Sequence, residues 1–248
     1  EAAWRGWCGG RGAEGTVTQL DDPDPAAQPL WTQRSTRRTL VHSVAPFDAT
    51  KAAAKRLGGT LNTAFLTIAT DAASAYHVEQ GSPVQALRAS MAISTRTETS
   101  GANAFSLVRM LVPSGEMSLD ERFRAIDEAT TEAVGATGRA NLDSMAAVAA
   151  GLPTSLLTRM ARQQSQTVDF ATSNVRGAPM PLYVAGAQLL HNIPVGPLSG
   201  VAFNLTLLSY HGNLDMGLNI DAAAVDDPEL LKRCLDDAIG RMTQCAKN

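Results

Sequence analysis

The segment 201–220 contains the pattern that most restricts the fold of this 248-residue chain. Two stretches rich in aliphatic and β-branched residues, 201–210 and 213–220, are separated by His211 and Gly212, as in a β-hairpin. Asp227 and Pro228 then have the order of an N-cap followed by a helix-opening proline. This end of the chain therefore predicts two antiparallel strands followed by a helix with an apolar stripe.

Strands and helices alternate along the preceding residues. Apolar and polar residues alternate at 39–44, 87–94 and 105–112, which predicts strands. Helices are expected at 48–57, at 60–76, from 118 and from 141 with a break near 151–153, with Asp48, Thr60 and the Ser118–Glu121 capping box at three of the starts. This order predicts an α/β fold with a mixed β-sheet flanked by helices.

Composition and charge exclude several classes of function. The net charge of −3 gives no electrostatic footprint for nucleic acid, and no apolar run approaches the roughly 20 residues of a membrane span. Three cysteines, Cys8, Cys234 and Cys245, have no metal-binding spacing, and their odd number argues against a disulfide framework. We therefore expect a reduced cytoplasmic protein with no metal site and no nucleic-acid partner.

A run of small polar residues marks the candidate site. An apolar segment leads from Asp169 into Thr172, Ser173 and Asn174, and Gly177 follows. Neutral hydroxyl and amide groups can hydrogen-bond an ester carbonyl or a developing oxyanion. We interpret the run as a strand that delivers a polar loop and forms half of a site. The alternative is a loop whose side chains bind their own backbone.

The same run resembles a known family. Residues 173–187 are similar to the SNVPGP…PLYLAGA block of the bacterial wax ester synthase/acyl-CoA:diacylglycerol acyltransferases, with Arg176 where that family usually has proline. Residues 58–63 resemble its GGTLND block, with Thr63 in place of aspartate. Residues 90–97 and 205–217 are similar to its VPVSxR block and its closing SYxGxLxxG hairpin. These blocks belong to the C-terminal half of that family.

The resemblance implies an architecture and a reaction. The fold would be the C-terminal half of a chloramphenicol acetyltransferase-like enzyme, in which two similar α/β halves enclose a tunnel. The reaction would transfer an acyl chain from acyl-CoA, a co-substrate, to diacylglycerol or a fatty alcohol, without a cofactor. Contact with a membrane surface or lipid droplet is left open.

The general base of that family lies in an HHxxxDG motif of the N-terminal half. The four histidines here, His42, His77, His191 and His211, are isolated, and none precedes Asp-Gly. No catalytic residue is therefore expected in this chain, and the expected partner is an N-terminal half that carries the base. Residues 1–38 are interpreted as an inter-domain linker and residues 39–248 as the C-terminal acyltransferase domain. Some of Trp4, Trp7 and Trp31 are expected to pack on a neighbour, with a partner domain as one candidate.

Six substrate-binding residues follow from the motif and the resemblance: Thr172, Ser173, Asn174, Gly177, Asn62 and Arg96. Asn62 lies in the first turn of a predicted helix, where capping is the alternative role. Arg96 follows a predicted strand, where a solvated or locally paired arginine is the alternative. Gly177 is expected to shape the polar loop.

Two other functions compete with the acyltransferase interpretation. A lone half could be a non-catalytic module that binds lipid or a partner and retains the tunnel wall. A related transferase could instead acylate sugars, polyketides or peptidyl carriers.

Overall fold

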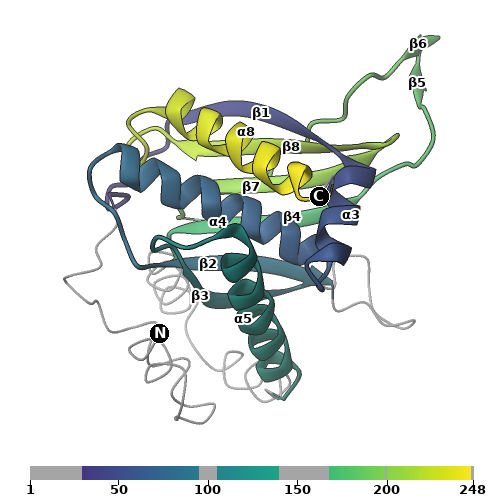
Figure 1. Cartoon of the computed structure of the whole chain (residues 1–248). Helices are drawn as coiled ribbons and strands as arrows, with labels where there is room; N and C mark the ends of the chain where they lie inside the picture. The colour runs from purple at the N-terminus through teal and green to yellow at the C-terminus, as the bar shows by residue number, and fades with distance from the viewer. Residues whose placement is uncertain (1–29, 95–104, 140–167, 199, 247–248) are drawn as a thin grey trace, which may run out of the picture.

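A computed structural model describes residues 30–94, 105–139, 168–198 and 200–246 (Figure 1). Six strands form one mixed sheet in the order β1-β8-β7-β4-β2-β3. Their bounds are β1 Arg38–Pro46, β2 Ala86–Ser94, β3 Phe105–Pro113, β4 Phe170–Arg176, β7 Phe203–Tyr210 and β8 Asn213–Asp221. The α/β class and the C-terminal hairpin predicted from the sequence are confirmed.

Strand β4 occupies the middle of the sheet. It runs parallel to β2 on one side and to β7 on the other, whereas the remaining pairs are antiparallel. Because side chains alternate along a strand, Phe170, Thr172 and Asn174 share one face of the sheet, and Ala171 and Ser173 share the other. We call these the helix face and the loop face.

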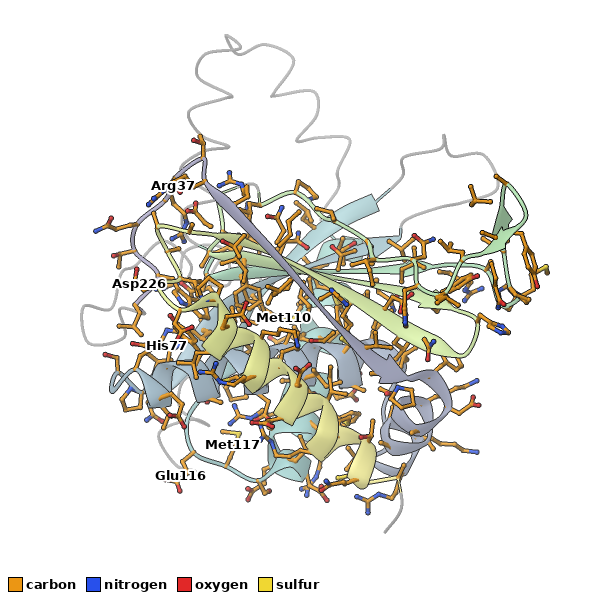
Figure 2. All side chains as sticks on the ribbon, turned by 90° about the horizontal axis from the view of Figure 1, so that it is seen from above. Arg37, His77, Met110, Glu116, Met117 and Asp226 are labelled. Carbon is orange, nitrogen blue, oxygen red and sulfur yellow. The ribbon has the colours of Figure 1, made fainter. Side chains whose placement is uncertain are left out.

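Four helices accompany the sheet in the described ranges: α3 Phe47–Arg56, α4 Leu61–Glu79, α5 Leu119–Arg139 and α8 Pro228–Gln244. Figures 1 and 2 show α4, α5 and α8 on the same side of the sheet. None of the helices in these ranges is long and apolar enough to cross a bilayer. The predicted helix from residue 141 lies outside the described residues.

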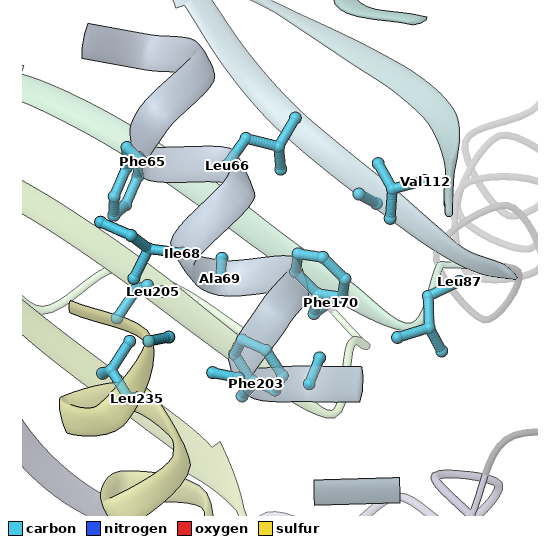
Figure 3. Close-up of a cluster of buried hydrophobic side chains, with 14 of the residues drawn as sticks. Phe65, Leu66, Ile68, Ala69, Leu87, Val112, Phe170, Phe203, Leu205 and Leu235 are labelled. Carbon is cyan, nitrogen blue, oxygen red and sulfur yellow. The ribbon is translucent and has the colours of Figure 1, made fainter. Parts of the chain in front are cut away.

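The core lies between α4 and the central strands (Figure 3). Phe65 and Ile68 of α4 are buried above Leu205 of β7. Phe170 and Phe203 on neighbouring strands stack with their ring centroids 5.1 Å apart. Helix α4 is buried around much of its circumference, which explains why its apolar residues do not follow a single stripe.

Three predicted helix caps are confirmed and one is wrong. Thr60 accepts from the Thr63 amide, Asp227 from the Leu230 amide, and Ser118 exchanges hydrogen bonds with Glu121. Asp48 is not a cap, because β1 runs directly into α3 and extended Pro46 occupies the N-cap position. Asp48 falls in the first turn, where its carboxylate still complements the helix dipole.

Trp31 packs inside the domain. Its side chain is 2% exposed, with ring centroids 4.3 Å from His77 and 5.3 Å from Phe203. The predicted packing of an indole is confirmed here, but its neighbours belong to this chain, whereas Trp4 and Trp7 lie outside the described residues. Packing against the sheet therefore begins before residue 38, where the sequence predicts the end of the linker. The division into linker and domain stays a prediction.

His77 is also a core residue. Its Nδ1 lies 2.8 Å from the Ala73 carbonyl oxygen, and its side chain is fully buried. Burial lowers the pKa of His77, because the charged imidazolium would lose its hydration. His77 therefore packs in the core, although it lies in the last turn of α4.

A short hairpin between β4 and β7 was not predicted. Strands β5 Tyr183–Val184 and β6 Ala187–Gln188 pair across a tight turn, where Ala185 and Gly186 both have positive φ. We call residues 178–190 the arm, which extends away from the body of the sheet (Figure 1).

Candidate functional site

Thr172, Ser173 and Asn174 lie inside strand β4, not in a loop. The expected polar loop is therefore wrong, because pairing with β7 continues through residue 176 and holds all three residues in extended backbone. Thr172 and Asn174 consequently face the helices, whereas Ser173 faces the opposite side of the sheet. A single wall made from all three side chains is not possible.

The three side chains differ in what they offer to a ligand. Thr172 is 2% exposed, and its Oγ1 lies 3.4 Å from the Ser90 carbonyl oxygen of β2. Ser173 is half-buried on the loop face, and Asn174 is exposed near the carboxyl end of β4. Asn174 is therefore the member of the run best placed to meet a ligand on the helix face.

Asn174 meets a second predicted site residue. Its Nδ2 donates to Oδ1 of Asn62 over 2.5 Å, although 112 positions separate them in the chain. Asn62 is exposed in the first turn of α4, so the amino end of that helix lies beside the carboxyl end of β4. The structure thus brings together the two motifs that the sequence singled out independently.

The amino end of α4 is fixed by the residues around Asn62. Thr60 and Thr63 form a reciprocal capping box, and Thr63 Oγ1 also donates to Asp127 Oδ1 of α5 over 2.7 Å. Residue 63 is threonine where the GGTLND block has aspartate. The carboxylate at this end of the helix comes instead from Asp127 of α5. It lies where the helix dipole favours negative charge.

Gly177 follows β4 where the chain passes close to β7. A Cβ atom at this position would collide with the Ser209 carbonyl oxygen and the Leu208 side chain. The Gly177 amide donates to Ser209 Oγ over 3.2 Å. This geometry gives Gly177 a packing role. Arg96, the remaining predicted site residue, lies outside the described residues.

Asp169 secures the other end of β4. It is 6% exposed, and its Oδ2 accepts from the backbone amide of Arg88 over 2.7 Å. Burial raises the pKa of Asp169, and the hydrogen bond from Arg88 and the charges of Arg88 and Arg34 oppose that rise. Asp169 thereby ties β4 to β2 at the end remote from Asn174.

A histidine–carboxylate pair was missed by sequence reasoning. His191 Nδ1 lies 3.0 Å from Oδ1 of Asp215, which is fully buried in β8. The two residues are 24 positions apart and share no motif, so the return of the arm across the sheet is what brings them together. Among the described residues, no group of three potential ligands could hold a metal ion.

The Asn62–Asn174 pair can act on a polarised carbonyl. Each amide group has two N–H donors, so the mutual hydrogen bond leaves three N–H groups available. Neutral donors of this kind stabilise an oxyanion without competing for the proton of an attacking alcohol. Both side chains are exposed, so the pair is accessible to a ligand.

Comparison with known proteins adds to this geometry. The family model described as the WS/DGAT C-terminal domain matches residues 101–243. A protein of Mycobacterium tuberculosis named as a diacylglycerol O-acyltransferase is 32% identical over 210 residues, covering 84% of this chain and 42% of the relative. Another from the same organism is 24% identical over 236 residues, covering 90% and 50%. The chain spans about half the length of these relatives.

Solved structures show the same fold. The wax ester synthase/diacylglycerol acyltransferase from Marinobacter aquaeolei VT8 matches with a TM-score of 0.68 and 21% identity, covering 95% of this chain and 57% of that protein. A condensation domain from the enacyloxin polyketide synthase matches with a TM-score of 0.59 and 16% identity, covering 97% and 49%. In each case about half of a longer chain corresponds to the present one.

Proposed function

Because the chain belongs to the WS/DGAT family, we propose that it is the C-terminal part of an acyl-CoA-dependent O-acyltransferase that makes triacylglycerol or wax esters. The acceptor would be diacylglycerol or a fatty alcohol. The observation that carries the proposal is the contact between Asn62 and Asn174, which joins the two family-like motifs in one polar wall.

The proposed reaction assigns a role to that wall. The acceptor hydroxyl attacks the thioester carbon, its proton passes to a base, and the carbonyl oxygen becomes an oxyanion. The C–S bond then breaks, and coenzyme A leaves as a thiolate that takes up a proton. Amide N–H groups of Asn62 and Asn174 would donate to the oxyanion, an effect of about 3 kcal/mol per donor in comparable sites.

The base is proposed to come from an N-terminal half that carries HHxxxDG. His77, buried with a lowered pKa, is unsuited to receive a proton from a substrate. The partner is further supported by the arm, where five large apolar side chains are exposed: Met180 60%, Leu182 40%, Tyr183 62%, Val184 66% and Leu190 71%. Apolar surface of this kind marks a contact with another surface.

Reconstitution tests the proposal. The chain is mixed with the N-terminal half of the 32% identical relative, and transfer from a radiolabelled long-chain acyl-CoA to diacylglycerol or hexadecanol is measured. We expect turnover with both halves, little with either alone, and a loss of about 100-fold or more for Asn174→Leu. Gln80→Leu is the matched control, because it alters an exposed amide at the opposite end of α4.

The same experiment separates the rival module. If the halves associate and bind acyl-CoA but no ester forms with either acceptor, the acyltransferase proposal is overturned and a non-catalytic binding module is favoured. The exposed arm is compatible with that alternative, because it requires only a partner surface. Acyl-CoA as the co-substrate and a cytoplasmic location with membrane or lipid-droplet contact stay predictions.

A further inference from the structure

The arm is attached to the sheet at a narrow base. Residues 177–190 contain no charged side chain, and the strands of the arm pair with each other rather than with the main sheet. At the base, the buried Tyr210 hydroxyl donates to the Leu189 carbonyl and accepts from the Leu182 amide, each over 2.8 Å. One hydroxyl thus holds both strands of the arm.

A single bridging hydroxyl leaves the arm free to pivot, so its direction depends on further anchors. The backbone amide of His211 donates to the Ala178 carbonyl, at the start of the arm, over 3.1 Å. The segment that returns from the arm is anchored by Asp215, which lies on β8 next to the strand that carries Tyr210.

Asp215 uses both carboxylate oxygens on the segment that returns from the arm. Oδ2 accepts from the Asn192 amide over 2.7 Å, and Oδ1 faces His191 Nδ1 at 3.0 Å. A carboxylate oxygen accepts, so the imidazole carries its proton on Nδ1 and donates. The Asp215 side chain is 0% exposed, whereas that of His191 is 47% exposed, so the ring closes over a carboxylate that water does not reach.

A buried carboxylate without donors is costly, and this gives the contact its strength. Hydrogen bonds to charged groups are about twice as strong as those between neutral groups. The contact also lies directly beyond the last residue of the arm, where a small displacement of the backbone becomes a large displacement at the β5–β6 turn. The pair is therefore placed to control the arm rather than the stability of the whole sheet.

We propose that His191 and Asp215 form a clasp that fixes the direction in which the arm leaves the sheet. Both are positioning residues, because they act through the arm and not on a substrate. The partner that the arm would meet, the N-terminal half, rests on the proposed function. The clasp itself is a property of this chain and can be tested without that partner.

Hydrogen exchange of the 248-residue chain, read by mass spectrometry, tests the clasp. His191→Leu removes the donor, and His191→Asn restores an N–H group close to the position of Nδ1. We expect His191→Leu to accelerate exchange of the amides at 182–192 about tenfold or more. Exchange in β7 and β8 should accelerate much less than exchange in the arm, and the thermal midpoint should fall only by the cost of the donor lost to Asp215.

The variant His191→Asn tests whether the hydrogen bond to Asp215, rather than the imidazole ring, holds the arm. His191→Asn should exchange like the wild type in the arm, because it restores the hydrogen bond and not the imidazole. The proposal is overturned if His191→Leu leaves exchange in the arm unchanged, if His191→Asn behaves like His191→Leu, or if the whole sheet loosens equally. Failure of the reconstituted halves to make ester would overturn the proposed function and leave these exchange results intact.

Discussion

The Asn174 side chain donates to Asn62 Oδ1 over 2.5 Å and so joins the central strand of the sheet to the first turn of the central helix. Asn174 lies two positions after the buried Thr172, and Asn62 directly precedes the buried Thr63. An exposed polar contact thus lies at the edge of a rigid, buried framework. A site built on such elements keeps its geometry better than one built on loops.

The coupling between these two amides should be measurable. In a double-mutant cycle with Asn62→Ala and Asn174→Ala, we expect a coupling free energy of about 0.5–1 kcal/mol, because the hydrogen bond is exposed to water. Urea unfolding of the four proteins measures it. A second cycle, which pairs Gln80→Ala with Asn174→Ala, is the control and should give no coupling free energy. Equal coupling free energies in the two cycles would contradict the contact.

Two glycine-to-alanine substitutions should change stability in opposite directions. A Cβ atom on Gly217 of β8 would collide with the Pro194 carbonyl oxygen of the loop that crosses the sheet, so we expect Gly217→Ala to cost about 1–3 kcal/mol. Gly240 of α8 has open space around its Cβ position, so Gly240→Ala should stabilise by about 0.5–1 kcal/mol. Denaturant midpoints at constant slope report both changes.

Trp31 should be essential for the stability of the domain. Trp31→Ala removes a buried indole that packs on α4 and β7, and we expect a loss of about 3–5 kcal/mol in the free energy of unfolding. Leu30→Ala is the control, because Leu30 is 38% exposed and should cost less than about 1 kcal/mol. Similar costs for the two variants would mean that the segment does not pack as described.

Stability should fall as the solution becomes more acidic than the pKa of an unfolded histidine. Burial lowers the pKa of His77 in the folded state, so the unfolded chain takes up the proton first. This loss begins near pH 6.5 and continues down to the lowered folded pKa, with a slope of at most about 1.4 kcal/mol per pH unit.

The variant His77→Leu isolates this effect. It should reduce the dependence of the unfolding free energy on pH between 7 and 5, relative to the wild type, when both are measured by urea unfolding. Leu30→Ala, a substitution of an exposed residue without a titratable group, should leave that dependence close to the wild type. An unchanged slope in His77→Leu would show that His77 is not held neutral by the fold.

Local signals predicted most of the framework. Thr60 and Asp227 predict the starts of two helices, because each is a capping residue. The β7–β8 hairpin is predicted by two β-forming stretches separated by a two-residue turn. The sequence could not order the strands, because the parallel placement of β4 between β2 and β7 depends on packing between distant segments. The arm also escaped prediction, since its paired strands have only two residues each.

The contacts among the candidate site residues were harder to predict than the residues themselves. Asn62 and Asn174 were both named from the sequence, but nothing in either motif specifies that they touch. Thr172 was placed beside Asn174 in one polar loop, whereas it lies within strand β4 and is buried on the helix face of the sheet. The His191–Asp215 contact had no local signal, because it depends on the path by which the arm returns.

The pairing of β1 with β8 determines when this domain can be completed. Arg38 lies opposite Asp221, so the edge strand β1, near the start of the described chain, pairs with β8, near the end of that chain. During synthesis from the amino end, β1 can pair with β8 along its whole length only after residue 221 has left the ribosome. Contacts between such distant residues slow folding. Meanwhile an open strand edge and the exposed Leu40 offer surface for aggregation, so this domain is expected to depend on chaperones while it is being made.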